Sequence, residues 1–200
     1  MLITYWSMFV ERELCSDDWV KALQSASQPL VLDVGANAGL FSHLVFCLNP
    51  QAEIIAIEPL PAMVEHINAL KQRKKMNLRC ISKAAGRASG EAMLESHHGY
   101  DGTSHIRLSG QPTDQTFHVE VTTLDQEIAK RPVLVMKIDV EGFEEEVIAG
   151  GMETLSRTQF LIIEAQNAAR RDRLTRLLGP NWHRQKLGSS DCLFTRIKAD

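Results

Sequence analysis

The sequence predicts an α/β fold with an open, mostly parallel sheet and helices on both faces. From Pro29 onward, short apolar runs rich in β-branched residues alternate with longer amphipathic stretches, as a parallel sheet with crossover helices requires. The 200 residues, 44% of them hydrophobic, suit one compact domain with its own core. We expect a single domain over 1–200, with an N-terminal helical segment at 1–28 and the α/β core at 29–200.

The order of elements follows from apolar periodicity and from residues that start or stop helices. Ser16 and the acidic residues after it predict a leading helix over 16–27. Pro61 suits the start of a helix over 61–75. The remaining expected elements are strand Leu30–Val34, helix Leu40–Leu48, strands 54–58, 77–81 and 133–139, helix 143–155, strand 159–164, helix 170–178, and a C-terminal antiparallel hairpin of Trp182–Leu187 and 192–197.

The stretch 84–115 is rich in Gly, Ser, Thr and His and is long for a simple connector. We expect it to be irregular. Alternation of apolar and polar residues over 117–121 predicts an added strand, and Thr123-Leu124-Asp125 then leads into a short helix.

Composition excludes several classes of protein. A formal net charge of −3 gives no overall attraction for phosphate backbones, so we expect no nucleic-acid partner. The longest apolar runs, such as 160–163, are far shorter than the ~20 residues that span a bilayer. No cleavable leader is evident, and the four cysteines are too scattered for a zinc site or a disulfide framework. We therefore expect a cytoplasmic protein without a membrane span, with reduced thiols.

The strongest local signal is the segment 33–39, with the sequence Asp-Val-Gly-Ala-Asn-Ala-Gly, between the first strand and the first helix. Gly35 and Gly39 allow a tight turn, and the helix start presents unpaired N–H groups to a ligand. A purely structural turn is the alternative. Glu58 follows Gly35 by 23 residues, close to the ~20 at which an acidic residue binds the ribose hydroxyls in dinucleotide folds.

The spacing of this segment argues against a pyrophosphate ligand. Asn37 stands where the dinucleotide fingerprint has its second glycine. Asp33 would repel a pyrophosphate, but it would attract the amino-acid part of S-adenosylmethionine. The sequence therefore favours S-adenosylmethionine over NAD.

A second polar group, Lys137, Asp139 and Glu141, follows the strand 133–139. Ligands of open α/β sheets bind beyond the carboxyl ends of the strands, so Asp139 and Glu141 are candidate catalytic carboxylates. Alternation places the three side chains on one side, where mutual pairing could instead be structural. Glu144, Glu145 and Glu146 are expected on a solvated helix face.

Glu164 ends the next strand. Together with Asp139 it could hold Mg²⁺, but a hydrogen-bonded strand end or a substrate contact is favoured, and we assign no metal ligand. The segment 97–105 contains three histidines that could supply a base over the crevice. A solvated loop is the equal alternative.

Taken in order, these motifs resemble those of the FkbM-type S-adenosylmethionine-dependent methyltransferases, from about 31 to 164. The resemblance includes 57–61, Asn68, 84–91, 123–125, 137–144 and Gly150-Gly151. It implies a Rossmann-like class I methyltransferase fold with a mostly parallel seven-stranded sheet. It also implies that S-adenosylmethionine is held at the methionine part by Asp33, Gly35, Ala36, Asn37 and Gly39, at the ribose by Glu58 and Pro59, and at the adenine by residues around Ala84.

The resemblance implies methyl transfer, most often to a hydroxyl of a small molecule, sugar or natural product. The enzyme must align the acceptor with the methyl carbon and remove its proton. Asp139 is the first candidate for this base or for an acceptor orienter, and Glu141 is the second. N-methylation of a peptide or a small-molecule amide or amine, and a non-catalytic S-adenosylmethionine-binding module, remain alternatives. The acceptor and the oligomeric state are not fixed by the sequence.

Overall fold

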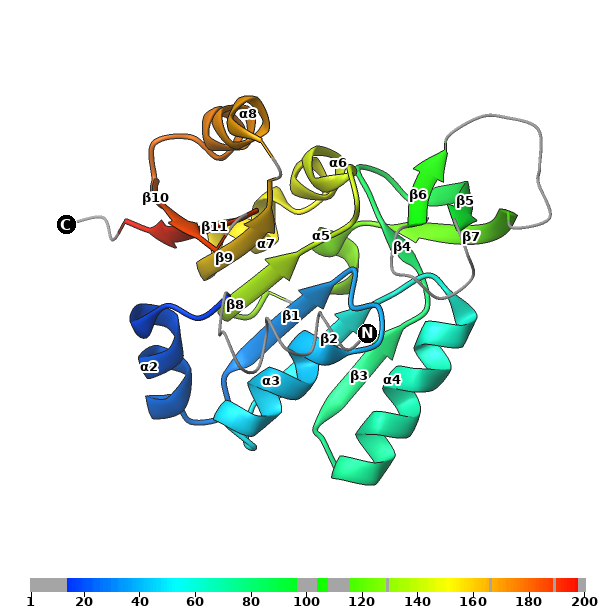
Figure 1. Cartoon of the computed structure of the whole chain (residues 1–200), viewed down its shortest axis with the longest axis horizontal. Coiled ribbons are helices and arrows are strands. Elements are labelled where there is room, and N and C mark those ends of the chain that lie inside the picture. The colour runs from blue at the N-terminus through cyan, green and yellow to red at the C-terminus, as the bar shows by residue number, and fades with distance from the viewer. Residues whose placement is uncertain are drawn as a thin grey trace.

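A computed structural model describes residues 14–96, 104–107, 116–128, 130–165, 167–188 and 190–197. Its main sheet contains β1 (Leu30–Val34), β2 (Glu53–Ile57), β3 (Leu78–Ile81), β8 (Val133–Ile138), β9 (Thr158–Glu164), β10 (Trp182–Leu187) and β11 (Asp191–Arg196). The seven strands have the order β10-β11-β9-β8-β1-β2-β3 (Figure 1). The strands β3, β2, β1, β8 and β9 are parallel, whereas β11 and β10 form the predicted antiparallel hairpin at the edge.

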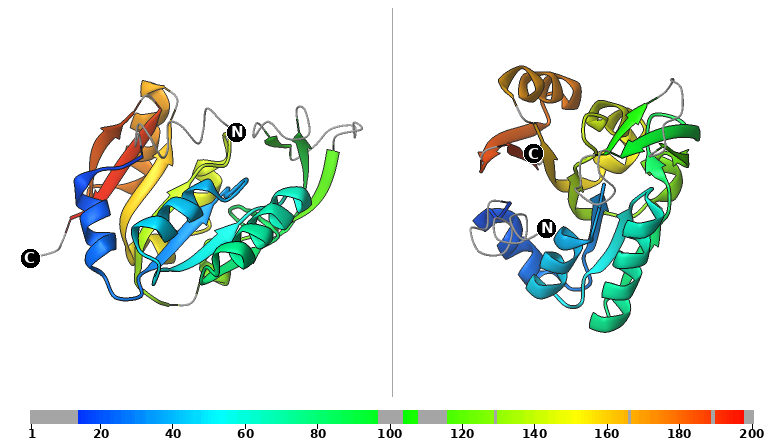
Figure 2. Two further views of the ribbon diagram at one scale, coloured as in Figure 1. Left: turned by 60° about the horizontal axis from the view of Figure 1, so that its bottom comes forward. Right: turned by 45° about the vertical axis from the view of Figure 1, so that its right-hand side comes forward.

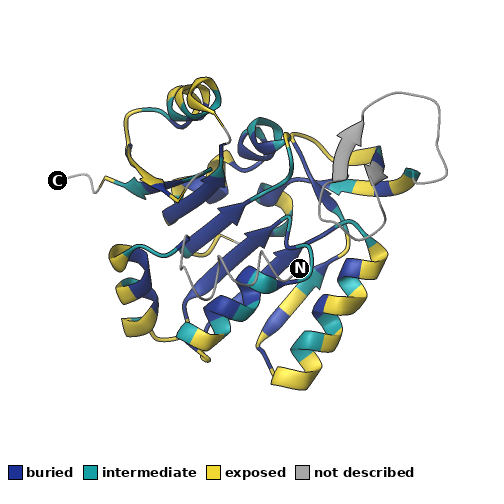
Figure 3. Ribbon diagram, in the orientation of Figure 1, coloured by how far each residue is buried: buried dark blue, intermediate teal, exposed yellow. Residues whose placement is uncertain are grey.

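Helices cover both faces of this sheet, as predicted (Figure 2). They are α2 (Asp17–Ser25), α3 (Leu40–Leu48), α4 (Pro61–Lys74), α5 (Leu124–Glu127), α6 (Glu144–Ala149), α7 (Met152–Ser156) and α8 (Ala168–Leu178). One buried cluster joins Trp19, Phe41 and Ile67 of the first three helices to one face. The other joins Leu124, Val147 and Leu174 to the opposite face. The central strands β1, β2, β8 and β9 are largely buried and the outer helix faces are exposed (Figure 3), as expected for a parallel sheet between two helical layers. The edge strand β10 is mostly exposed.

Most predicted elements are confirmed to within two residues, and β1, α3 and β10 have the predicted bounds. One helix prediction is wrong, because 143–155 forms two helices, α6 and α7, separated at Gly150-Gly151. The carboxylate of Asp125 accepts hydrogen bonds from the N–H groups of Glu153 and Thr154 at 3.1 and 2.7 Å. It therefore stabilises a new helix start.

A further correction concerns Ser16, which stands before α2 but makes no capping hydrogen bond with its side chain.

In the described part of the chain, none of the helices is both long and apolar enough to cross a membrane.

The expectation of an irregular 84–115 is wrong for its described residues. They contribute β4 (Ala84–Ala85), β5 (Gly90–Ser96) and β6 (Ser104–Arg107), which join β7 (Thr116–Thr122) in a four-stranded sheet with the order β4-β7-β5-β6. β7 confirms the strand predicted at 117–121. The smaller sheet lies on the side toward which the arrowheads of the central strands point (Figure 1). Most of the histidine-containing segment 97–105 lies outside the described residues.

Candidate active site

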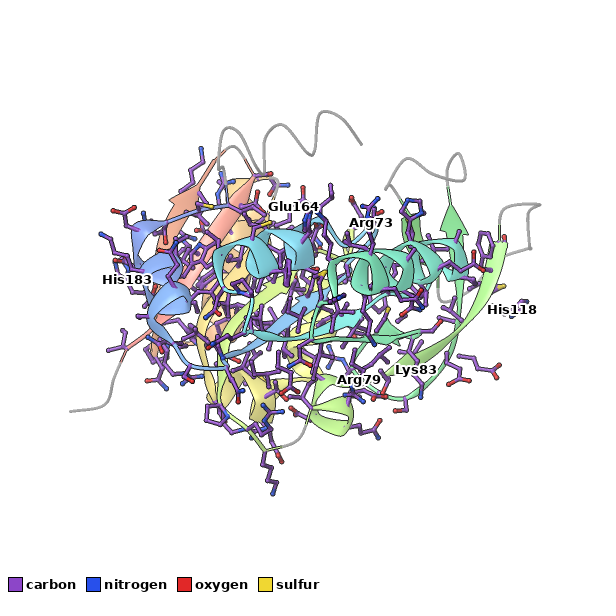
Figure 4. The ribbon with its side chains drawn as sticks, turned by 90° about the horizontal axis from the view of Figure 1, so that it is seen from below. Arg73, Arg79, Lys83, His118, Glu164 and His183 are labelled. Carbon is purple, nitrogen blue, oxygen red and sulfur yellow. The ribbon has the colours of Figure 1, made fainter. Side chains whose placement is uncertain are left out.

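A row of charged residues crosses one face of the main sheet where its parallel strands end. The parallel register pairs Asp33 of β1 with Lys137 of β8, and the antiparallel register pairs Glu164 of β9 with Asp191 of β11. Because side chains alternate along a strand, Asp139 lies on the same side as Lys137. Glu58 follows β2 at the same edge. We use the name charged row for six residues: Glu58, Asp33, Lys137, Asp139, Glu164 and Asp191. Figure 4 labels Glu164 at the end of β9.

The turn after β1 is fixed by backbone geometry. Gly35, Asn37 and Gly39 have φ of 75°, 49° and 76°, a region that glycine adopts at low cost and asparagine tolerates. The N–H groups of Gly35 and Ala36 donate to the carbonyl of Ile57 at 2.9 and 3.2 Å. A Cβ atom at Gly35 would lie 1.8 Å from the carbonyl oxygen of Asp139. Position 35 therefore requires glycine, because the turn packs directly on the end of β8.

Asp33 lies behind this turn and is fully buried. Its Oδ2 accepts hydrogen bonds from the backbone N–H and the hydroxyl of Ser42 at 3.0 and 2.6 Å. Burial raises the pKa of Asp33, although Lys137 and Ser42 act in the opposite direction. The observed contacts of Asp33 therefore anchor α3 to β1. Sequence reasoning missed Ser42, whose position one turn into a helix gave no separate signal.

Glu58 joins the ends of β1 and β2. Its side chain is buried, Oε2 accepts from the N–H of Asn37 at 2.8 Å, and Oε1 accepts from the N–H of Leu60 at 3.0 Å. Burial raises the pKa of Glu58, while the two N–H groups act to lower it. Pro59 follows directly and is half-buried, and Ala84 is buried in a small apolar cluster that Leu60 packs against. The predicted donor-binding residues thus lie on adjoining strand ends.

Lys137 and Asp139 form an ion pair within the charged row. Lys137 is 6% exposed, and its Nζ lies 2.7 Å from Oδ2 of Asp139. Burial alone would raise the pKa of Asp139, but attraction and a hydrogen bond from Lys137 outweigh it and lower that pKa. Burial opposes the charge of Lys137 as well, yet Asp139 and Asp33 raise its pKa. Both groups are therefore charged at neutral pH.

Glu164 has the opposite electrostatic character. Burial raises its pKa to about 7, and repulsion by Asp139, Glu141 and Asp191 adds to the effect. A hydrogen bond links its side chain to Asp139, so the protonated carboxyl of Glu164 donates to the ionised Asp139. A carboxyl with a pKa near neutrality can take up a proton during a reaction. This property distinguishes Glu164 from its neighbour.

Glu141 stands beside this pair in a turn with φ of 48°. Asp139, Glu141 and Glu164 each place one carboxylate oxygen within 4.8 Å of the others, a separation that a hard cation could bridge. One oxygen of Asp139 already accepts a hydrogen bond from Lys137, and clusters of acidic side chains are common without an ion. We therefore assign no metal ligand.

The helix after this turn corrects another expectation. Glu144 is 1% exposed, accepts a hydrogen bond from the N–H of Gly142 at 3.1 Å, and forms an ion pair with Arg170 of α8. It therefore does not belong to a solvated face. Glu145 and Glu146 do form more exposed pairs, with Arg173 and Arg87. No sequence pattern links position 144 to 170, since the contact arises only when α8 packs on α6.

The strand order, with its central switch between β1 and β8 and a glycine turn after β1, defines a class I methyltransferase fold. Solved structures agree. Precorrin-6y C5,15-methyltransferase from Geobacter metallireducens superposes with a TM-score of 0.53 over 91% of this chain and 86% of that one, at 12% identity. The human methyltransferase 10 domain containing protein gives a TM-score of 0.56 over 96% and 83%, at 11% identity. At these identities the likeness concerns the fold alone.

Residues 33–183 match the methyltransferase FkbM domain, so the chain belongs to this family of methyltransferase enzymes, as its motifs predicted. Membership implies S-adenosylmethionine as the methyl donor. The 2-O-methyltransferase NoeI of Sinorhizobium fredii is 28% identical over 79% of this chain and 69% of its own length. The hexuronic acid methyltransferase AglP of Haloferax volcanii is also 28% identical, over 78% and 64%. The chain thus spans about two thirds of these relatives.

Proposed function

We propose that the protein transfers a methyl group from S-adenosylmethionine to a hydroxyl oxygen of a sugar or a similar small molecule. The observation that carries the proposal is the juxtaposition of the glycine turn after β1 with the carboxylates at the ends of β8 and β9. The turn at Gly35 packs on Asp139, and Asp139 is hydrogen-bonded to Glu164. A donor site and proton-accepting groups therefore adjoin. The printed names of two relatives, a 2-O-methyltransferase and a hexuronic acid methyltransferase, support a sugar acceptor.

The residues present fit the donor. Gly35, Ala36, Asn37 and Gly39 would surround its methionine part, with Asp33 holding the turn from behind. Glu58 and Pro59 would meet the ribose, and residues around Ala84 would flank the adenine. When bound, S-adenosylmethionine supplies an activated methyl group on a positively charged sulfur. The protein then needs chiefly to orient the acceptor and to remove its proton.

The carboxylates favour a hydroxyl over an amine as the acceptor. A hydroxyl group keeps its proton at neutral pH and gains nucleophilicity when a nearby base accepts that proton. A neutral amine already has a free lone pair and can lose its proton after the transfer. Asp139, Glu141 and Glu164 together provide the base that a hydroxyl requires, so oxygen is the proposed site of methylation.

Binding and turnover test this proposal together. Calorimetric titrations with S-adenosylmethionine, S-adenosylhomocysteine and NAD should show binding of the two adenosyl ligands alone. Transfer of an isotopically labelled methyl group should then be measured with neutral sugars, hexuronic acids, amines and peptides. Labelled product from the sugars, with a methyl ether by mass spectrometry, supports the proposal. Labelling of amines alone would replace oxygen by nitrogen, and donor binding without transfer to any acceptor would favour a binding module.

Two substitutions separate the donor and acceptor roles. Glu58→Ala should weaken binding of S-adenosylmethionine about 10–100-fold, because it removes the acceptor for the N–H groups of Asn37 and Leu60. Asp139→Asn should leave that affinity within about threefold and lower kcat at least about tenfold. Glu65→Gln, on the exposed face of α4, is the matched control. A reversal of the two effects would overturn the assignment of roles.

A further inference from the structure

Lys137 is a buried cation at the centre of the proposed catalytic edge. Lys137 is the one charged residue of the otherwise apolar strand β8. Its neighbours Met136 and Ile138 are fully buried. Nζ lies 2.7 Å from Asp139. A lysine is almost never buried unless it is paired, so the ion pair explains how Lys137 is tolerated. It does not yet explain what the pair does.

Stability alone is a weak reason for such a pair. The cost of removing two charges from water is about as large as their attraction, and apolar replacements of similar volume are often neutral or stabilising. The surroundings suggest another role. Three carboxylates attract the ammonium group of Lys137 and raise its pKa: Asp139, Asp33 from β1 and Asp191 from β11. One cation therefore stands among several carboxylates of the charged row.

The partners of Asp139 and Glu164 differ in kind. Asp139 has one oxygen on Lys137 and a hydrogen bond to Glu164. Glu164 is faced by Asp139 directly after β8, by Glu141 from the following turn and by Asp191 from β11. On α8, the guanidinium of Arg171 donates one hydrogen bond to the carbonyl of Ala165 at 2.9 Å. The two neighbouring carboxylates therefore meet opposite electrostatic surroundings.

We propose that Lys137 is a positioning residue that holds Asp139 as a charged, fixed carboxylate and so leaves Glu164 to take the proton of the acceptor. The inference deepens the proposed function and rests on it. Asp139 then orients the acceptor and accepts the hydrogen bond that Glu164 donates once it has been protonated. This division of labour makes Glu164, at the end of β9, the catalytic base.

The acceptor O–H bond breaks, its proton moves to an oxygen of Glu164, and the released electron pair forms the new O–C bond to the methyl group. The C–S bond of the donor breaks with both electrons retained by sulfur, which becomes the neutral sulfur of S-adenosylhomocysteine. Glu164 ends the step as a neutral carboxyl, hydrogen-bonded to Asp139, and returns its proton to water before the next cycle.

The first test needs neither donor nor acceptor. Carboxyl ¹³C resonances of Asp and Glu are followed against pH by NMR in the unliganded protein, with E164Q and D139N used for assignment. Glu164 should titrate near pH 7 and Asp139 below its ordinary range. In K137M, the midpoint of Asp139 should rise by at least about one pH unit, because the cation that favours its charged form is lost.

Kinetics supply the second readout. E164Q should lower kcat about 10²–10⁴-fold while the KM for the donor stays within about threefold. The wild-type kcat should rise with pH through an inflection near 7, and E164Q should lose this inflection. K137M should lower kcat at least about tenfold without weakening donor binding by calorimetry. K21M, an exposed lysine on α2, is the matched control for charge removal.

If K137M leaves the midpoint of Asp139 unchanged, Lys137 does not hold Asp139 in its charged form and the proposal fails. If E164Q keeps its kcat or its pH inflection, another group takes the proton. If the NMR midpoints behave as stated but no acceptor is methylated, the proposed function fails while control of the row by Lys137 stands. Should K137M not fold, Lys137→Gln keeps a donor to Asp139 without the charge and takes its place.

Discussion

The two halves of the proposed catalytic edge use the same residue type in different ways. On the β1–β2 half, the carboxylate of Glu58 is buried and both oxygens accept from backbone N–H groups. On the β8–β9 half, Asp139 and Glu164 are half-buried and are held by each other and by the side chain of Lys137.

The difference lies in what can change. Backbone N–H groups do not change their charge near neutral pH, so the two partners of Glu58 stay the same while neighbouring side chains titrate. Side-chain partners carry charges that respond to one another, so protonation at Glu164 alters the surroundings of Asp139. A rigid half suits recognition of a constant donor, and a titratable half suits removal of a proton.

The largest expected effect concerns the rigid half. Gly35→Ala places a Cβ atom against the carbonyl oxygen of Asp139 and forces alanine to a φ of 75°. Gly179→Ala causes only the backbone strain, because Gly179 has a φ of 78° but open space around it. We expect a loss of about 1–3 kcal/mol for Gly179→Ala and about 1–3 kcal/mol more for Gly35→Ala, by denaturant unfolding. Equal losses would show that the close approach at Gly35 does not matter.

Two neighbouring ion pairs join α6 to α8 beside the titratable half, one buried and one exposed. Arg170→Met leaves Glu144 buried without its cation and should cost about 3 kcal/mol. Arg173→Met breaks the pair with Glu145 on the same two helices, where the side chains are 58% and 43% exposed, and should cost at most about 1 kcal/mol. Equilibrium unfolding in urea measures both. Similar losses would mean that Glu144 gains nothing from Arg170.

Most elements of the main sheet could be predicted because each has its own signal within a few consecutive residues. Pro61 sits at a helix start, and the apolar runs of β1 and β9 are each complete in themselves. The four-stranded sheet escaped prediction because its pairing is non-local: Ala92 of β5 is registered with Val119 of β7, and neither strand is apolar along its length. The break between α6 and α7 depends on Asp125, which precedes α7 by 27 residues.

The candidate site was predictable in composition but not in its electrostatics. Spacing placed Gly35, Glu58 and Asp139 at one edge of the sheet, and the structure brings them together. The raised pKa of Glu164 comes first from burial and then from Asp139, Glu141 and Asp191. Asp191 reaches Glu164 through the β9–β11 register. Burial of Lys137 and pairing of Glu144 with Arg170 likewise arise from packing. A single chain pattern contains no record of such contacts.

The smallest expected effect is a pH dependence of stability that reports on the titratable half. The pKa of Glu164 rises on folding from an ordinary 4.5 to about 7, so between these values the folded protein binds a proton that the unfolded chain does not. Stability from Glu164 is therefore present below about pH 4.5 and is lost as the pH rises through 7. His43 acts in the opposite direction, because burial and the nearby Lys74 and Arg73 lower its pKa.

The difference between wild type and E164Q removes the contribution of His43, which is common to both proteins. We expect the free energy of unfolding of the wild type, relative to E164Q, to fall between about pH 5 and about pH 8. Urea unfolding at a series of pH values measures it, with Glu65→Gln as the variant that should follow the wild type. Parallel curves for wild type and E164Q would show that Glu164 titrates alike in the folded and unfolded chains, and the two halves of the edge would then be equally rigid.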